Sequence, residues 1–341
     1  FDCIFLAQRL TDPANGGIAV LDTIYALIGR MLYDVGLYDD WQIAPFFKGV
    51  AGTGKSTVLR VIRMFYENDD VGIMANSIEG TFGLAALYDK LIVMCFELRG
   101  DFGLDQAALQ SLMSGEPMSI PVKFKTAIPN FRWTAPITAA GNMTADWNDA
   151  NGAITRRWVI IEFLYAVTGS ANDPRLMAKI TEELARILVK CNRAYRYKVR
   201  TCGDKGAWSF NPTTKEPEVL PQYFHDRAKA LGKAINSLRS FIEDDGNIVR
   251  PTGAADEDAD SFYMKWADFT ATYKQFCTTT TAKAIKMSSV EAYGNVLRTL
   301  DLEKKLCEMR DPDQGDQLVL AEWLIGCKML AAPHGAGQAQ K

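Results

Sequence analysis

The sequence has little histidine and no paired cysteine motif. Only His225 and His334 occur among its 341 residues, so zinc chemistry is not expected. The seven cysteines form no C-x-x-C pair, and their odd number argues against a framework of disulfide bonds. We therefore expect the thiols to be reduced, as they are in a reducing compartment.

Long hydrophobic runs, a large net charge and an initiator methionine are also absent. No apolar run reaches the roughly 18 residues of a membrane span, which predicts a soluble protein without a membrane partner. The net charge is only −3, so any contact with a nucleic acid should be local. The chain begins Phe1-Asp2-Cys3 without a signal-peptide pattern, and we expect it to be a piece of a longer protein.

The clearest motif is GVAGTGKST at residues 49–57, which fits the phosphate-loop pattern GxxxxGK[ST]. Its flanks suggest a strand over 43–50 and a helix over 56–68, the context that the pattern requires. Lys55 is expected to contact the β- and γ-phosphates of ATP, and the Ser56 hydroxyl to ligate Mg²⁺. The predicted nucleotide-binding residues are Gly49, Gly52, Thr53, Gly54, Lys55, Ser56 and Thr57.

Short apolar or β-rich runs alternate with helical patterns from Ile43 to Phe163. This alternation predicts a three-layer α/β domain with a mainly parallel sheet, whose ligands bind at the carboxyl ends of the strands. The runs after the phosphate loop cover residues 71–75, 91–96, 133–140 and 158–163.

Four polar residues near these strands are candidates for catalysis. Glu97 ends an apolar strand, where a carboxylate can activate water or hold the water shell of a metal. Asn142 also ends a strand and could bind the γ-phosphate, although Gly-Asn is a common turn as well. Arg156 and Arg157 precede the strand at 158–163, and either could act as an arginine finger on a neighbouring subunit's triphosphate. Nearly equal intervals separate Lys55, Glu97 and Asn142, which favours one shared site.

A hairpin is predicted between Glu97 and Asn142. Two β-like stretches, around 119–122 and 126–133, flank a basic and aromatic tip formed by Lys123, Phe124 and Lys125. Lysines there could bind DNA phosphates and the phenylalanine could stack on a base. An ordinary amphipathic strand would have the same pattern.

Helical patterns dominate the remaining chain. One helix is expected at 18–33, another at 173–199 and a third at 221–243. The predicted domains are an N-terminal helical collar segment at 1–42, an ATPase core at 43–170, a helical region at 171–250, an acidic linker at 251–261, a possible winged helix at 262–330 and a disordered tail at 331–341. The region at 262–330 could bind DNA or could serve as a structural lid.

The end of the second of these helices is rich in basic residues. Between Lys190 and Arg200 the chain has five basic residues and two tyrosines. These cations could contact a nucleic-acid backbone, or they could simply favour the helix dipole on a solvated face.

Five segments together resemble the superfamily 3 helicases. They are GVAGTGKST, LIVMCFE, SLMSGEPMSIPVKFKTA, RWTAPITAAGN and DWNDANGAITRRWVIIEF. The likeness is closest to the poxvirus-type primase-helicase ATPase module of large DNA viruses. It is firm over residues 45–165 and weak after 250.

The resemblance implies an AAA+ core that forms a hexameric ring around single-stranded or forked DNA, with an upstream primase region in the full-length protein. It implies that Glu97 activates water, Asn142 is the sensor and Arg156 or Arg157 is the finger. Lys123 and Phe124 fall at a DNA-contacting hairpin tip. Papillomavirus-like relatives have Lys-His there, so Phe124 is a departure that leaves stacking possible. The implied location is intracellular, in host cytoplasm or nucleus at sites of viral DNA replication.

Two alternatives remain from the sequence. A ring-shaped loader or scaffold on DNA would share the same ATPase residues. A nucleoside or nucleotide kinase would share the phosphate loop, but it would need an acceptor pocket and an arginine-bearing lid. The succession of Glu97, Asn142 and Arg156 argues against the kinase, whereas the sequence does not separate a loader from an unwinding motor.

Overall fold

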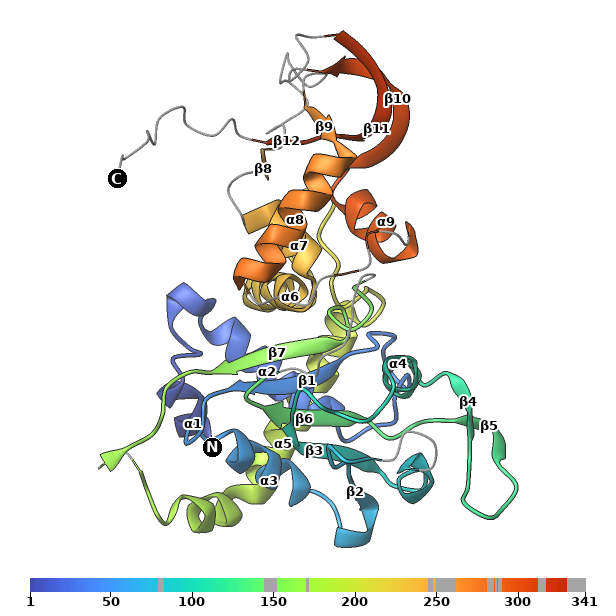
Figure 1. The fold of residues 1–341 in the computed structure, drawn as a ribbon. Coiled ribbons are helices and arrows are strands. Elements are labelled where there is room, and N and C mark those ends of the chain that lie inside the picture. Colours follow the sequence, from blue (N-terminus) through green and yellow to red (C-terminus); the bar gives the residue numbers. More distant parts are fainter. Residues whose placement is uncertain are drawn as a thin grey trace, which may run out of the picture. The chain divides into compact units, whose positions relative to one another are not determined.

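The computed structural model describes residues 1–78, 83–143, 152–169, 172–244, 248–249, 262–280, 285, 287, 290–311 and 317–329. The chain divides into two compact units, shown in Figure 1. Unit 1 comprises Phe1–Trp147 and Gly152–Leu231, and unit 2 comprises Asn148–Asn151 and Gly232–Lys341.

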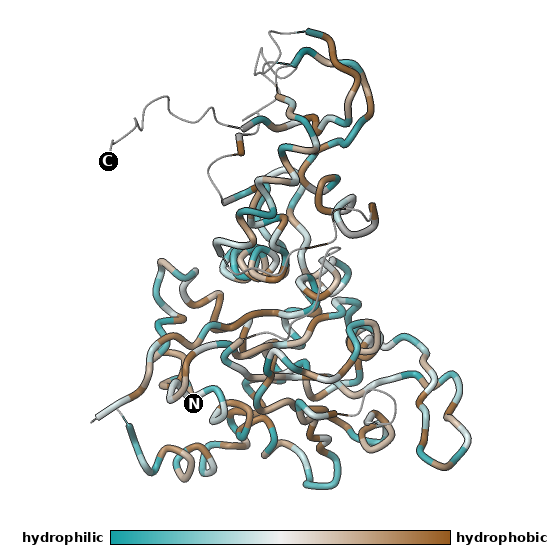
Figure 2. Tube along the Cα trace, in the orientation of Figure 1, coloured by the Kyte–Doolittle hydropathy of each residue, from teal (hydrophilic) through white to brown (hydrophobic). Residues whose placement is uncertain are grey.

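Unit 1 is built on a five-stranded sheet. Its strands are β1 (Ala44–Gly49), β2 (Val71–Ile73), β3 (Ile92–Leu98), β6 (Ile137–Gly141) and β7 (Trp158–Phe163). They lie in the order β2-β3-β6-β1-β7, and all neighbouring pairs are parallel. The predicted α/β class with a mainly parallel sheet is thus confirmed. Hydrophobic residues run along the central strands, as Figure 2 shows, because both faces of such a sheet are covered.

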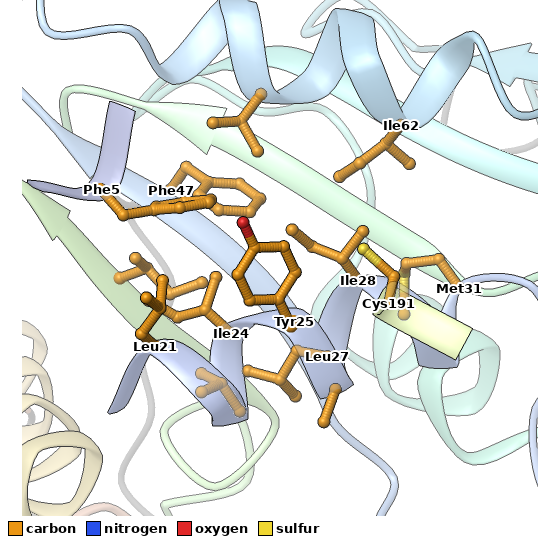
Figure 3. Close-up of a cluster of buried hydrophobic side chains, with 14 of the residues drawn as sticks. Phe5, Leu21, Ile24, Tyr25, Leu27, Ile28, Met31, Phe47, Ile62 and Cys191 are labelled. Atoms are coloured by element: carbon orange, nitrogen blue, oxygen red, sulfur yellow. The ribbon is translucent and has the colours of Figure 1, made fainter. Parts of the chain in front are cut away.

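Helices cover one face of this sheet with an aromatic core. They are α1 (Asp2–Ala7), α2 (Ile18–Arg30), α3 (Lys55–Arg63) and α5 (Leu176–Cys202). Tyr25 of α2 lies at the centre of the cluster in Figure 3, surrounded by side chains from α1, α2, β1, α3 and α5. These neighbours are Phe5, Leu21, Ile24, Leu27, Ile28, Met31, Phe47, Ile62 and Cys191.

A buried ion pair joins α2 to α5 through the segment before β1. Arg30 Nε lies 2.9 Å from Asp39 Oδ2, and the Tyr195 hydroxyl of α5 donates to the same oxygen at 2.6 Å. Burial alone would raise the pKa of Asp39, but the Arg30 charge and the hydrogen bonds from Tyr195 and the Trp41 amide hold it below its usual value. Tyr195 is thereby fixed in the helix pair that supports β1.

The remaining elements of unit 1 include the predicted hairpin. It consists of antiparallel β4 (Pro117–Ile120) and β5 (Ile128–Arg132), and it projects away from the sheet in Figure 1. The others are α4 (Gln106–Ser114) and the short 3₁₀ turns η1 (Pro13–Asn15), η2 (Asn68–Asp70) and η3 (Gly83–Ala86). Helix α6 (Gln222–Ile235) begins in unit 1, and its residues from Gly232 onward belong to unit 2.

Unit 2 packs three helices with a three-stranded antiparallel sheet. The helices are α7 (Ser237–Asp244), α8 (Trp266–Thr280) and α9 (Val290–Thr299), and the sheet has the order β10-β11-β9. Its strands are β9 (Tyr263–Lys265), β10 (Glu303–Asp311) and β11 (Gln317–Ile325), while β8 (Ile248–Val249) pairs with β12 (Lys328–Met329). The core contains Phe241, Phe269 and Tyr273.

Several predicted boundaries differ from the structure. The helix expected at 221–243 is two helices, α6 and α7, separated at Asn236, whose side-chain oxygen accepts from the Arg239 amide. The helix expected after Ser56 ends at Arg63, and Asn68–Asp70 forms a 3₁₀ turn. The predicted linker at 251–261 and tail at 331–341 lie outside the described residues. Among the described helices, none has the length and hydropathy to cross a membrane.

Candidate functional site

The phosphate loop connects the end of β1 with the start of α3. Gly49 has φ +155°, and a Cβ there would lie 1.8 Å from the Phe163 carbonyl oxygen, so only glycine fits beside β7. Gly54, the residue before α3, has φ +98°. Thr53 is buried and its hydroxyl donates to the Val50 carbonyl at 2.9 Å, which closes the turn. The loop therefore leads into a helix N-terminus, where an anion is stabilised.

Lys55 is held within this loop. Its ammonium donates to the Gly49 carbonyl at 2.7 Å and to the Val50 carbonyl at 2.5 Å. An ammonium has three N–H donors, so one remains for a phosphate oxygen. Burial lowers the pKa of Lys55, and the negative charge of Glu97 partly opposes this.

One cavity of about 350 Å³ unites most of the predicted nucleotide site. Lys55, Glu97 and Asn142 all border it, although they come from α3, β3 and the end of β6. Because β6 lies between β1 and β3, Asn142 follows the strand between those that carry the loop and Glu97. The other lining residues are Ala51, Gly52, Thr53, Gly54, Ser56, Thr57, Phe96 and Gly141. Gly49 is absent from this lining and borders an adjacent cavity, which Asn142 also borders.

Glu97 is exposed toward solvent and forms an ion pair. Arg99 lies two residues further along, just after the end of β3, and its Nη2 and Nε atoms are 3.2 and 3.3 Å from Glu97 Oε1. The hydrogen bond to Glu97 raises the pKa of Arg99. Both contacts use Oε1, so Oε2 is available to bind a water molecule.

Asn76 and Gln8 support the site but were not predicted from sequence. Asn76 follows β2, and its side-chain oxygen accepts from the Arg99 amide at 2.9 Å. Gln8 is 2% exposed and joins the loop to the segment after β7: its Nε2 donates to the Thr53 carbonyl at 3.1 Å, and its Oε1 accepts from the Tyr165 amide at 2.9 Å. A polar residue at a strand end is a signal that could have identified Asn76, whereas nothing in the sequence distinguishes Gln8.

Arg156 and Arg157 lie away from this cavity. They border a separate cavity of about 450 Å³ with Trp41 and Trp208. Arg157 is buried, and its guanidinium donates to the Ala153 carbonyl and the Ser114 hydroxyl, both at 2.9 Å. Arg156 is exposed, and its carbonyl oxygen accepts from the Trp208 indole at 2.5 Å. Of these two arginines, Arg156 is exposed and Arg157 is buried.

The tip of the β4–β5 hairpin also lies apart from the nucleotide cavity. Phe124 is 95% exposed with φ +60°, and the Lys123 ammonium lies 5.8 Å from its ring centroid. Lys123 and Lys125 are both exposed. An aromatic ring displayed between two lysines can stack on a base while the lysines contact phosphates.

The donor groups at the cavity fit Mg²⁺ bound together with a nucleotide. The Ser56 hydroxyl and the Glu97 carboxylate are both oxygen donors, which Mg²⁺ prefers. No cluster of three or more His, Cys, Asp or Glu side chains able to hold a metal occurs among the described residues. A magnesium ion here would therefore take its remaining ligands from phosphates and water.

Comparison with known proteins finds one family and several distant structures. The model of a "Family of unknown function (DUF5906)" matches residues 47–157, from the phosphate loop to Arg157. An apo structure of the NrS-1 C-terminal region is 13% identical with a TM-score of 0.49, and the match covers 96% of this chain and 76% of that one. A crystal structure of JCV helicase with a bound acetamide compound is also 13% identical, with a TM-score of 0.30, and the match covers 71% of this chain and 72% of that one.

Proposed function

We propose that the chain is the ATP-hydrolysing motor of a superfamily 3 DNA helicase with an AAA+ core. The observation that carries the proposal is the single cavity bordered by Lys55, Glu97 and Asn142. A phosphate loop alone serves many activities. A carboxylate and an amide placed beside it, at the ends of two neighbouring parallel strands, supply the groups that NTP hydrolysis needs.

The residues around the cavity have different roles in hydrolysis. Lys55 and the amides that begin α3 bind the phosphates and stabilise negative charge on them. Glu97 orients the attacking water through Oε2, while Arg99 fixes the carboxylate through Oε1. Asn142 donates an amide hydrogen bond to the γ-phosphate or to that water. Ser56 and Glu97 would hold Mg²⁺, which neutralises phosphate charge when bound.

A ring of identical subunits supplies the missing positive charge. Arg156 borders a different cavity from Lys55, so within one chain it serves no phosphate bound at the loop. In a hexamer its exposed guanidinium would enter the neighbouring subunit's site as the arginine finger. Hydrolysis at such an interface would couple the site to the hairpin tips, which would move one DNA strand through the ring.

The proposal also covers the partners of this motor and the process in which it acts. The partners would be single-stranded and forked DNA and an upstream primase region. The setting would be viral DNA replication within the host cytoplasm or nucleus. The sequence resemblance supports these elements of the proposal.

The decisive experiment measures ATP turnover with and without single-stranded DNA, on protein whose mass is determined in the same buffer with ATP and Mg²⁺. We expect a hexamer with DNA-stimulated turnover and displacement of a strand from forked DNA. Lys55→Ala should lower turnover to background, because the charge that stabilises the transferred phosphate is lost. A monomer indifferent to DNA would contradict the proposal. DNA-stimulated turnover without strand displacement would identify a loader instead.

A further inference from the structure

The charged residues in the second half of helix α5 are all basic. From Leu184 to Cys202 it contains six basic residues and no acidic residue. The basic residues are Arg186, Lys190, Arg193, Arg196, Lys198 and Arg200. The two lysines have partners within unit 1: Lys190 binds Asp2 at 2.9 Å, and Lys198 donates to the Thr23 hydroxyl at 2.9 Å. The four arginines have a different arrangement.

These arginines form a row on the outer face of α5. The helix buries Ile180, Ile187, Cys191, Tyr195 and Cys202 against the rest of unit 1. At 3.6 residues per turn, the opposite face carries Arg186, Arg193 and Arg200, which recur every seventh residue at a spacing of roughly 10 Å. Arg196 and Tyr197 lie between the last two, and Tyr197 is 64% exposed. We call this set the arginine row.

Within the described part of the chain, no side chain forms an ion pair with the arginine row, although Glu182 lies exposed four residues before Arg186. All four guanidinium groups are exposed, and none forms a hydrogen bond or ion pair with another described residue. Like charges three or four residues apart, as at Arg193, Arg196 and Arg200, destabilise a helix. The helix dipole favours cations only in the last turn, and Arg186 lies roughly 24 Å before the end of α5. The four guanidinium groups are therefore accessible to anionic groups of another molecule.

We propose that the arginine row binds the phosphodiester backbone of a nucleic-acid strand, as a contact surface separate from the hairpin tip. Guanidinium groups bind phosphate oxygens in bidentate pairs, and the exposed Tyr197 ring offers a face for a base or a sugar. The inference does not rest on ATP hydrolysis, since phosphate contacts need only the exposed side chains.

The packing of α5 argues against an anionic membrane as the partner. A helix that binds a bilayer surface inserts its apolar face between the lipids. The apolar face of α5 is already buried, with Cys191 0% and Tyr195 1% exposed, so it cannot be inserted. The accessible face of α5 therefore carries the charges of the arginine row without an apolar face that could enter a bilayer, which suits binding to a polyanionic strand.

The test is a binding titration of the full chain with a fluorescein-labelled single-stranded oligonucleotide, without ATP or Mg²⁺, over a series of salt concentrations. Arg193→Gln combined with Arg200→Gln removes two phosphate contacts. We expect the slope of log K against log salt to become shallower by about 1.4, and binding at 0.1 M salt to weaken roughly tenfold or more. Gln keeps helix propensity, so the melting temperature should be unchanged.

The matched control is Arg60→Gln combined with Arg63→Gln, which removes the same charge from exposed positions on α3. We expect this variant to keep the original salt slope. Equal weakening in both double variants would overturn the proposal, because general charge would explain it. Unchanged binding in the row variant would overturn it as well. The proposal would also be overturned if the row variant lost binding to anionic phospholipid vesicles but kept its binding to the oligonucleotide.

Discussion

Arg156 and Arg157 are adjacent in sequence, yet their guanidinium groups serve different purposes. Arg157 is 4% exposed and ties the segment before β7 to α4 through the Ser114 hydroxyl. Arg156 points toward solvent while its main chain is fixed by Trp208. In the proposed ring, a finger must leave its own subunit. Arg156 is the arginine suited to that role, whereas the buried Arg157 forms a structural contact.

Separate substitutions should distinguish these two arginines. We expect Arg156→Ala to lower ATP turnover of the assembled ring about a thousandfold, the usual contribution of a finger, with no change in melting temperature. Arg157→Ala should instead cost about 1–3 kcal/mol of unfolding free energy, because it leaves buried polar groups without their donor. Steady-state turnover and thermal melting of both variants measure this. A turnover defect confined to Arg157→Ala, with normal melting, would reverse the assignment.

Sequence predicted the residues that carry chemical motifs and missed those that support them. Lys55, Glu97 and Asn142 follow strands in a recognisable succession, and the structure places them at one cavity. Gln8 belongs to no motif: it reaches Thr53 across 45 residues of chain, a contact that only the tertiary fold creates. Arg99 is two residues from Glu97, just beyond the end of β3, and its pairing with the carboxylate depends on the backbone that follows the strand, where Asn76 accepts a hydrogen bond from the Arg99 amide.

At the level of elements, strands were predicted better than breaks between helices. The predicted strand at 158–163 matches β7 in full, since buried parallel strands are continuous apolar runs. The separation of α6 from α7 was missed because the hydrophobic pattern continues through it, and only the capping contact of Asn236 marks the boundary. Likewise β9 is three residues long and merges with the apolar pattern of α8.

The role of the β4–β5 hairpin can be tested as that of a single element, because the aromatic ring and the lysine charges at its tip can be removed in separate variants. Phe124→Ala should weaken single-stranded DNA binding roughly tenfold or more, by loss of stacking, with an unchanged salt slope. Lys123→Gln with Lys125→Gln should make the slope shallower by about 1.4. Both variants should lose strand displacement. Lys215→Gln, at an exposed turn elsewhere in unit 1, is the control for charge. Full strand displacement by both hairpin variants would exclude the tip from the DNA path.

At the scale of the whole molecule, each of the two units has hydrophobic core residues of its own. A core of unit 1 contains residues from Ile4 to Phe224, a core of unit 2 contains residues from Leu238 to Cys327, and these two cores share no described residue. A cooperative unfolding unit corresponds to one core, so two cores allow two transitions. The nucleotide cavity is lined only by residues of unit 1.

Calorimetry of the full chain should therefore show two unfolding transitions, of which ATP with Mg²⁺ shifts only one. Ligand at a hundred times its Kd stabilises the folded state by about 2.7 kcal/mol. For a unit of this size that corresponds to a rise of roughly 5–10 °C in the transition of unit 1. Lys55→Ala should remove the shift while keeping both transitions, because it removes a phosphate contact and leaves both cores intact. A single transition whose temperature rises with nucleotide would contradict this expectation. It would show that the two cores unfold together and that nucleotide binding stabilises unit 2 as well as unit 1.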